Sequence, residues 1–215
     1  MTVAAAILAA RPESALAVAD GQPAVRRIAD AAWSGGALPI VVISFDPDGA
    51  VLHALAGAPA TLEAPAPIEA GPVGQIVRAA DAALRLVRET AAVLVWPARL
   101  CWVGPETVTT LIEAFGTRPD VVLEPTYRGE AGWPKLLPAT RLETFRALPV
   151  DAMPDDLFEG LRAAGVAFEA VETGDPGVVV DGRTPRAELP PYDGPSGPGA
   201  GHAHEWGEGV AAIDP

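Results

Sequence analysis

Residues 8–25, LAARPESALAVADGQPAV, decide how this chain is interpreted, because they connect a strand-like segment to a helix-like one. The apolar run at Ala4–Ala9 predicts a buried β-strand, and the apolar spacing over Pro23–Trp33 predicts an α-helix. In many nucleotide-binding α/β proteins the turn after such a strand is rich in glycine and basic residues, since it holds phosphates. Here residues 11–13 read RPE, and no glycine occurs before Gly21. The segment has the position of a phosphate-binding turn without its usual chemistry.

The same alternation of elements continues along the chain. Uniformly apolar or β-branched runs predict further strands, at Pro39–Phe45, Ala91–Pro97, Pro119–Pro125, Val166–Glu172 and Gly177–Val180. Helical spacing and helix start signals predict helices at Gly74–Thr90, Gly104–Phe115, Thr140–Ala147 and Asp155–Ala164. Apolar strands that alternate with amphipathic helices predict an α/β fold, a three-layer Rossmann-like sandwich with a mostly parallel sheet.

The composition changes at Leu189. The following thirteen residues, LPPYDGPSGPGAG, hold four prolines and four glycines and cannot build a core. We therefore divide the chain into one domain, residues 1–188, and a linker and tail, residues 189–215. The tail contains HAHEW, whose His202, His204 and Glu205 are metal-binding groups, although a solvated tail is the commoner explanation. Alternatively, Trp206 and the apolar residues after it dock on a protein partner.

Charge and cysteine content narrow the function classes. The net charge of −13, from 28 acidic and 15 basic residues, repels a phosphate backbone, so we expect no nucleic-acid partner. A small nucleotide held with Mg²⁺ stays compatible with it. Cys101 is the only cysteine, which excludes an intramolecular disulfide and predicts a packing residue. The first apolar run has no basic residue before it, and no run of about 20 apolar residues exists, so we expect a cytoplasmic protein without a membrane segment.

Several segments follow one another in an order that resembles the MobA-like NTP transferases, particularly the molybdopterin cytidylyltransferase-like branch. ILAA resembles the end of the family's first strand, and DGQPAVRRIADAAWSGG resembles its G-x-P segment and helix. EAGPVGQIVRAADAAL resembles the segment near the base and ribose, LEPTYRGEAGWPKLLP the G-x-x-G-x-P segment, and VVVDGRTPRAEL the closing D-x-D-T-P. The resemblance implies a nucleotide-diphospho-sugar transferase-like fold, Mg²⁺ as cofactor, and transfer of NMP from an NTP to molybdopterin or a related acceptor.

The resemblance also shows what this chain has lost. Nucleotidyl transfer builds negative charge on phosphates, which backbone N–H groups, Arg or Lys, and Mg²⁺ stabilise. Where the family has its glycine-rich loop, Pro12 lacks an N–H and Glu13 adds a negative charge. Ala10 and Arg11 are the residues left to contact the nucleotide, and Arg11 alone can pair with a phosphate.

The implied metal site is reduced to one carboxylate. The family's D-x-P aspartate aligns with Trp96, and an indole cannot coordinate Mg²⁺, which requires oxygen ligands. The second carboxylate survives as Asp181, either as a metal ligand or as an aspartate that hydrogen-bonds its own turn. Trp96 and Trp102 either fill the vacated pocket or line it for a different planar ligand.

The remaining candidates come from two segments. Gly71, Gly74 and Gln75 align with the base-binding segment, although Gly-Pro-x-Gly is also ordinary loop-to-helix chemistry. Lys135 is the candidate catalytic cation, next to Trp133, which either stacks on a ligand or packs in the core.

Three functional hypotheses follow from these residues. The first is a catalytically impaired or inactive family member, retained to bind a small nucleotide, a pterin-like ligand or a protein partner, and linked to molybdenum cofactor maturation. The second is an active nucleotidyltransferase in which Arg11, Lys135 and Asp181 take over the missing roles. The third is a pure interaction module that uses the acidic surface and the tail.

Overall fold

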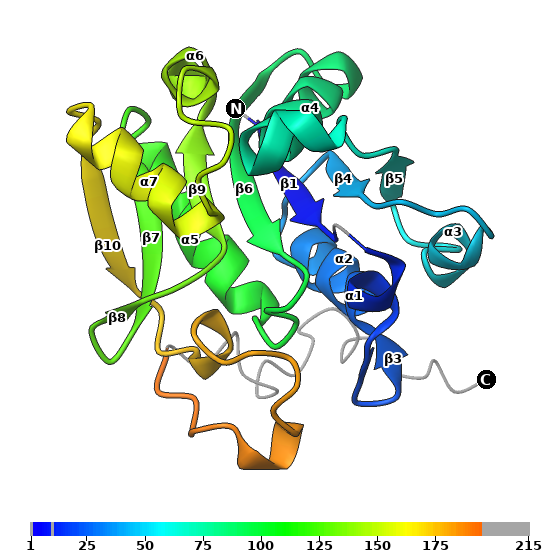
Figure 1. The fold of residues 1–215 in the computed structure, drawn as a ribbon. Helices are drawn as coiled ribbons and strands as arrows, with labels where there is room; N and C mark the ends of the chain where they lie inside the picture. The colour runs from blue at the N-terminus through cyan, green and yellow to red at the C-terminus, as the bar shows by residue number, and fades with distance from the viewer. Residues whose placement is uncertain (1, 10, 195–215) are drawn as a thin grey trace, which may run out of the picture.

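The computed structural model describes residues 2–9 and 11–194, and its centre is a β-sheet. The strands in this part of the chain are β1 (Thr2–Leu8), β4 (Ile40–Ile43), β5 (Ala60–Glu63), β6 (Thr90–Pro97), β7 (Val122–Tyr127), β8 (Glu130–Ala131), β9 (Lys135–Pro138) and β10 (Phe168–Glu172). They form one sheet with the spatial order β10-β7-β9-β6-β1-β4-β5, and β8 pairs with β7 (Figure 1). A separate hairpin joins β2 (Val18–Ala19) to β3 (Gln22–Pro23).

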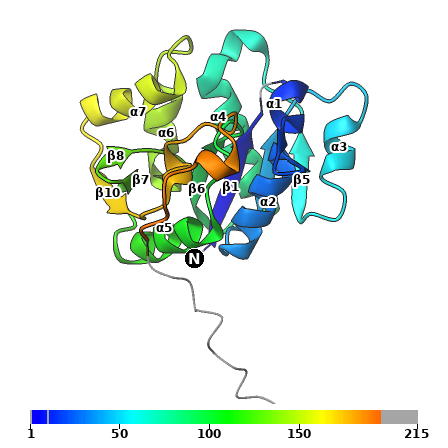
Figure 2. The ribbon, with the colours of Figure 1, turned by 90° about the horizontal axis from the view of Figure 1, so that it is seen from below.

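Helices cover both faces of the sheet. They are α1 (Pro12–Leu16), α2 (Ala24–Ser34), α3 (Ala50–Ala54), α4 (Gly71–Leu86), α5 (Pro105–Thr117), α6 (Leu142–Arg146) and α7 (Pro154–Ala163). Helices α2 and α5 pack their apolar residues into one core, whereas α4, α6 and α7 pack into a second core on the opposite face (Figures 1 and 2). This arrangement confirms the predicted three-layer α/β sandwich. None of the helices in residues 2–9 and 11–194 is long and apolar enough to cross a membrane.

The sheet is mostly parallel, and its topology creates a switch point. β1 pairs in parallel with β4 on one side and with β6 on the other. The chain runs outward from β1 through β4 to β5 and then returns to β6, on the other side of β1. In open α/β sheets, ligands bind outside the carboxyl ends of the strands at the place where the strand order reverses. Here that place lies beyond the ends of β1 and β6.

Strands β8 and β9 are the antiparallel members of the sheet, and the apolar pattern did not predict β9. It lies antiparallel between β6 and β7 and carries a lysine, Lys135, on a buried position. The burial of Lys135 is possible because its ammonium group is neutralised by Glu124 of β7, at 2.5 Å. Pairing with a distant carboxylate is not visible in a local sequence pattern.

The predicted strand at Gly177–Val180 is wrong. A short 3₁₀ helix, η3 (Pro176–Val178), covers its first two residues, and a turn and a bend follow. The Asp175 carboxylate accepts hydrogen bonds from the Gly177 N–H, the Gly104 N–H and the Thr107 hydroxyl, all at 2.8 Å. Aspartate side chains that bind nearby N–H groups favour turns over strand ladders, which explains the difference.

The first residues of the Pro/Gly-rich linker lie against the domain. The Tyr127 hydroxyl donates to the Pro191 carbonyl at 2.9 Å, and the Asp193 N–H donates to the Gly174 carbonyl at 2.8 Å. Arg128 forms an ion pair with Asp193 at 2.6 Å. The boundary between residues 188 and 189 stays a prediction, and the HAHEW segment lies outside the described residues.

Candidate functional site

Two concave sites lie side by side at the switch point. The ends of β1 and β6 are joined there by a hydrogen bond of 2.9 Å from the Ala98 N–H to the Leu8 carbonyl. On one side lies a cavity of about 500 Å³, here called the polar pocket, whose lining includes Glu13, Ser14, Arg99, Cys101, Asp181 and Arg183. On the other side lies a cavity of about 860 Å³, here called the apolar cavity, whose lining includes Leu8, Phe45, Ile68, Gly71, Gln75 and Met153.

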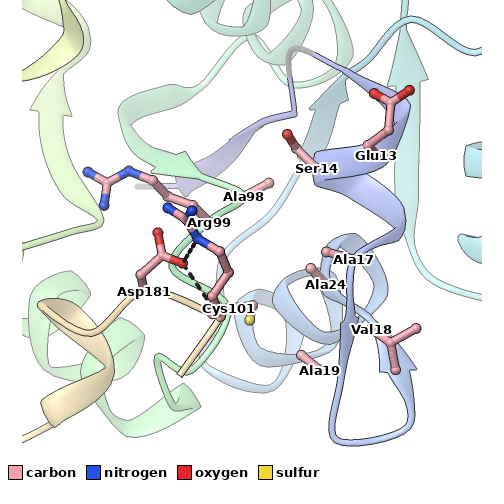
Figure 3. A pocket seen from close by; sticks show the side chains of 12 residues that line it. Glu13, Ser14, Ala17, Val18, Ala19, Ala24, Ala98, Arg99, Cys101 and Asp181 are labelled. Carbon is pink, nitrogen blue, oxygen red and sulfur yellow. Dashed lines mark hydrogen bonds and ion pairs between the residues drawn. The ribbon is translucent and has the colours of Figure 1, made fainter. Parts of the chain in front are cut away.

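A short helix replaces the expected phosphate loop at the polar pocket. Helix α1 begins directly after Arg11, and its first turn contains Pro12 and the exposed Glu13. The N–H groups of Ser14 and Ala15 both donate to the Arg11 carbonyl, at 3.0 and 3.3 Å. Because these donors are used inside the helix, they are not directed at a ligand. Figure 3 shows Glu13 and Ser14 on the side of the pocket opposite Asp181.

Two tryptophans fill the region where the resemblance places a metal ligand. The Trp96 side chain is fully buried in the core, and its Nε1–H donates to the Leu100 carbonyl at 2.8 Å. Trp102 is also buried, and its Nε1–H donates to the Thr184 carbonyl at 3.0 Å. Trp96 is absent from the lining of both cavities. For Trp96 the geometry favours packing over contact with a ligand, whereas Trp102 also lines a separate cavity of about 460 Å³ together with Arg27 and Asp175.

Asp181 lies in the polar pocket but is engaged by its own turn. Its Oδ1 accepts hydrogen bonds from the backbone N–H and the Nε–H of Arg183, at 3.0 and 3.1 Å (Figure 3). Burial alone would raise the pKa of this carboxyl group, but the hydrogen bonds from Arg183 outweigh that effect and hold the pKa below its ordinary value. Of the two roles considered for Asp181, metal ligand or turn aspartate, the hydrogen bonds support the turn aspartate, and the residue also lines the pocket.

Arg99 and Arg183 are pocket residues that the sequence did not single out. Arg99 stands two positions after Pro97, the last residue of β6, and Arg183 stands two positions after Asp181, so nearness to a strand end or to a candidate residue was the available signal. Together with Glu13 and Asp181, they give two cations and two anions among the described residues that line the pocket. Burial raises the pKa of the neighbouring Cys101 thiol above its ordinary value, so that group is neutral at pH 7. The pocket thus carries no excess of positive charge for a triphosphate.

The residues present do not fit a Mg²⁺ ion. This ion takes near-octahedral oxygen ligands and usually needs carboxylates together with substrate phosphates. Trp96 offers no oxygen from its side chain, and Asp181 already accepts from Arg183. Within residues 2–9 and 11–194, no three His, Cys, Asp or Glu side chains cluster in a way that could hold a metal.

The structure places Lys135 away from both cavities. Its ammonium lies 2.5 Å from the Glu124 carboxylate, which also pairs with Arg162 at 2.6 Å. The Trp133 and Phe158 rings lie over the ammonium, each with its centroid 5.2 Å away. Neither Lys135 nor Trp133 lines either of the two cavities, and both are buried. Lys135, Glu124 and Arg162 therefore form a partly buried ion cluster, and Lys135 does not share a cavity with Asp181.

Two of the predicted base-binding residues line the apolar cavity. The Gln75 amide accepts from the Ala66 N–H at 2.8 Å and donates to the Ala66 carbonyl at 3.0 Å, so it is already used on both sides. Gly71 has φ = +58°, and a Cβ at this position would collide with the Val150 carbonyl oxygen. Gly74 does not line the cavity, because it packs against the methyl group of Ala70.

Two other predicted residues, Ala10 and Arg11, are not placed in either cavity by the structure. Ala10 lies outside the described residues. Arg11 is exposed and does not belong to the lining of the polar pocket. Of the eight predicted site residues, the structure brings Gly71 and Gln75 together in one cavity and places Asp181 in the other.

The comparisons with solved structures agree with this topology. A nucleotidyl transferase from Methanothermobacter thermautotroptrophicus superposes with a TM-score of 0.67 at 19% identity, over 83% of this chain and 90% of that one. A 4-diphosphocytidyl-2C-methyl-D-erythritol synthase gives a TM-score of 0.65 at 15% identity, over 83% and 91%. A Mycobacterium tuberculosis H37Rv protein in complex with manganese gives a TM-score of 0.60 at 14% identity, over 80% and 89%.

The family comparison covers most of the domain. No curated protein matches the chain. The model of the MobA-like NTP transferase domain matches residues 11–165, from the short helix α1 to the end of α7. Because this match spans more than half of the 215 residues and agrees with the sheet topology, the chain belongs to the MobA-like NTP transferase domain family.

Proposed function

We propose that this chain is a family member that has lost nucleotidyl transfer and retains small-molecule binding at the switch point. The observation that carries the proposal is Trp96. This residue stands where the resemblance implies a metal-binding aspartate, and its indole is buried and hydrogen-bonded to Leu100. The position at which a metal site would need a carboxylate is thus occupied by a side chain of the hydrophobic core.

The charge balance supports the same conclusion. Transfer from an NTP requires donors and cations directed at the phosphates, where removal of one such contact typically lowers the rate about 10²- to 10³-fold. In α1 the N–H groups of Ser14 and Ala15 donate to the Arg11 carbonyl, and Glu13 adds a carboxylate to the lining of the pocket. Two such losses together would lower the rate by about 10⁴-fold or more.

The position of the two cavities supports retained binding. Both lie at the carboxyl ends of β1 and β6, where sheets of this topology bind their ligands. Their volumes of about 500 and 860 Å³ fall within the range of about 300–1,000 Å³ that is usual for small-molecule sites. A nucleotide or pterin-like ligand and a link to molybdenum cofactor maturation stay predictions of the resemblance.

A pyrophosphate-release assay with CTP, GTP, ATP and UTP, each with Mg²⁺ or Mn²⁺, tests the loss of transfer. A molybdopterin acceptor should be included, and we expect no release above the level without protein. Release that requires the metal and disappears in Asp181→Asn would contradict the proposal, because it would assign Asp181 a catalytic role. Glu188→Gln, outside the lining of both cavities, is the matched control for the removal of one carboxylate.

A further inference from the structure

We propose that the apolar cavity binds an uncharged, apolar small molecule. This inference rests on the proposed function, because it names the ligand class of the same switch-point site. It differs from a nucleotide site in the chemistry of the walls.

The walls of the apolar cavity offer no charge to a ligand. Among the described residues that line it, none carries a charged side chain, and the large side chains are Leu8, Phe45, Ile68 and Met153. The polar side chain in this lining is Gln75, whose amide is bound on both sides by Ala66. A charged or strongly polar ligand would lose its hydration here without gaining partners, whereas an apolar ligand would gain free energy by leaving water.

Three exposed apolar side chains converge at the rim of this cavity. Ile68 is 94% exposed, Met153 63% and Phe45 58%. They come from three separate parts of the chain: the segment after β4, the 3₁₀ helix η1 (Ile68–Ala70) and the residue before α7. Single exposed apolar residues need no explanation, but their convergence on one cavity marks a binding site.

The cavity is also pre-formed. Five of its lining residues are prolines, whose φ angles are fixed: Pro65, Pro67, Pro72, Pro97 and Pro154. The two hydrogen bonds between the Gln75 amide and the Ala66 backbone hold the 64–67 wall, and Gly71 fits closely against the Val150 carbonyl. A rigid concave site loses little conformational entropy on binding and therefore suits a small ligand.

An uncharged fluorescent probe, N-phenyl-1-naphthylamine, tests the proposal with the full chain. We expect saturable 1:1 binding with an increase and a blue shift of the emission. Met153→Glu and Ile68→Glu, two exposed positions that should fold normally, should each weaken binding about tenfold or more, because each places a charge on the rim. Leu52→Glu is the matched control, since Leu52 is 60% exposed and lies outside the cavity lining.

Three results would overturn the inference. They are the absence of saturable probe binding, an equal loss in Leu52→Glu, and displacement of the probe by a nucleoside triphosphate. Sedimentation at the same concentrations tests whether a second copy of the chain occupies the cavity. Self-association that the probe reverses would assign the cavity to a protein contact. Pyrophosphate release is measured on the same preparation. Failure of probe binding without release contradicts this inference alone, whereas release contradicts the proposed function.

Discussion

The polar pocket and the apolar cavity share one edge of the sheet but differ in what surrounds them. The hydrogen bond between Ala98 and Leu8 separates them at the ends of β6 and β1. On the polar side, α1 and two buried tryptophans occupy the space near the strand ends, and the pocket's charges balance. On the apolar side, proline-rich loops keep a larger cavity open. The comparison shows that the topology fixes where the two cavities lie, while the loops and α1 fix the chemistry of their walls.

The two sides also differ in what individual side chains do for stability. Trp96 adds a large apolar surface to the core, which stabilises the fold. Gln75 instead uses its amide to hold a loop against α4, which shapes a cavity. One side thus gains core packing from an indole, whereas on the other side a side chain of α4 holds the loop that lines the cavity.

The largest effect is expected from restoring the implied metal ligand, Trp96→Asp. The substitution leaves a cavity and a buried charge, so the free energy of unfolding should fall by about 5 kcal/mol, measured by urea denaturation. Trp33→Asp, at a half-exposed indole, should lower it by less than about 1 kcal/mol. A stable Trp96→Asp variant that binds Mg²⁺ would show that the polar side can still hold a metal, and the contrast between the two sides would disappear.

The next effect concerns the ion cluster that lies outside both cavities. Glu124→Gln leaves the buried Lys135 without its charged partner and should lower the free energy of unfolding by about 3 kcal/mol. Probe binding by the folded variant should stay unchanged, because neither residue lines the apolar cavity. Glu143→Gln, at a side chain that is 88% exposed, is the control and should change stability by less than about 0.5 kcal/mol. A large loss of binding affinity in folded Glu124→Gln would connect the cluster to a ligand site.

A smaller effect is expected at the wall of the apolar cavity. Gln75→Leu removes two hydrogen bonds to Ala66 and should lower the free energy of unfolding by about 1–2 kcal/mol, measured by thermal and urea denaturation. It should also weaken probe binding, since the 64–67 wall is less well held. Gln22→Leu, which loses one hydrogen bond to Asp30 elsewhere, should leave probe binding unchanged. Tighter nucleotide binding by wild type than by Gln75→Leu would instead favour a base contact.

The smallest effect is a dependence on pH in the polar pocket. The folded-state pKa of Asp181 lies below its ordinary value of 3.8, so its ionised form contributes stability above that pH. This contribution is lost as the pH falls through the lower, folded-state pKa. Asp181→Asn should therefore be less stable than wild type by about 0.5 kcal/mol at pH 7, and the difference should vanish in acid. A difference that persists unchanged to pH 2 would mean that the charge of Asp181 is not responsible.

The central part of the fold could be predicted from the sequence because its signals are local. β1, β4 and β6 are uniformly apolar, and α2, α4 and α5 have clear helical spacing. The missed strand β9 and the false strand at Gly177–Val180 depend on distant side chains. A carboxylate of β7 neutralises the lysine of β9, and Asp175 caps the 3₁₀ helix.

The candidate site divides in the same way. Gly71, Gln75 and Asp181 were singled out from the resembling segments, and the structure places each of them at a cavity. The apolar character of the larger cavity could not be predicted, because Phe45, Ile68 and Met153 are far apart in sequence. Only the folded chain brings such residues to one rim.

The placement of β1 in the middle of the sheet has a consequence for biosynthesis. Its parallel partner β6 begins about 90 residues later, since Thr2 pairs with Thr90. At about 5–20 residues per second, the ribosome releases β6 on the order of 5 to 20 s after β1. During that interval one edge of this alanine-rich apolar strand has no partner strand. Exposed strand edges of this kind can aggregate or recruit chaperones. The crevice at the ends of β1 and β6 can form only once β6 has been made. The same pairing of β6 with β1 covers the exposed edge of β1.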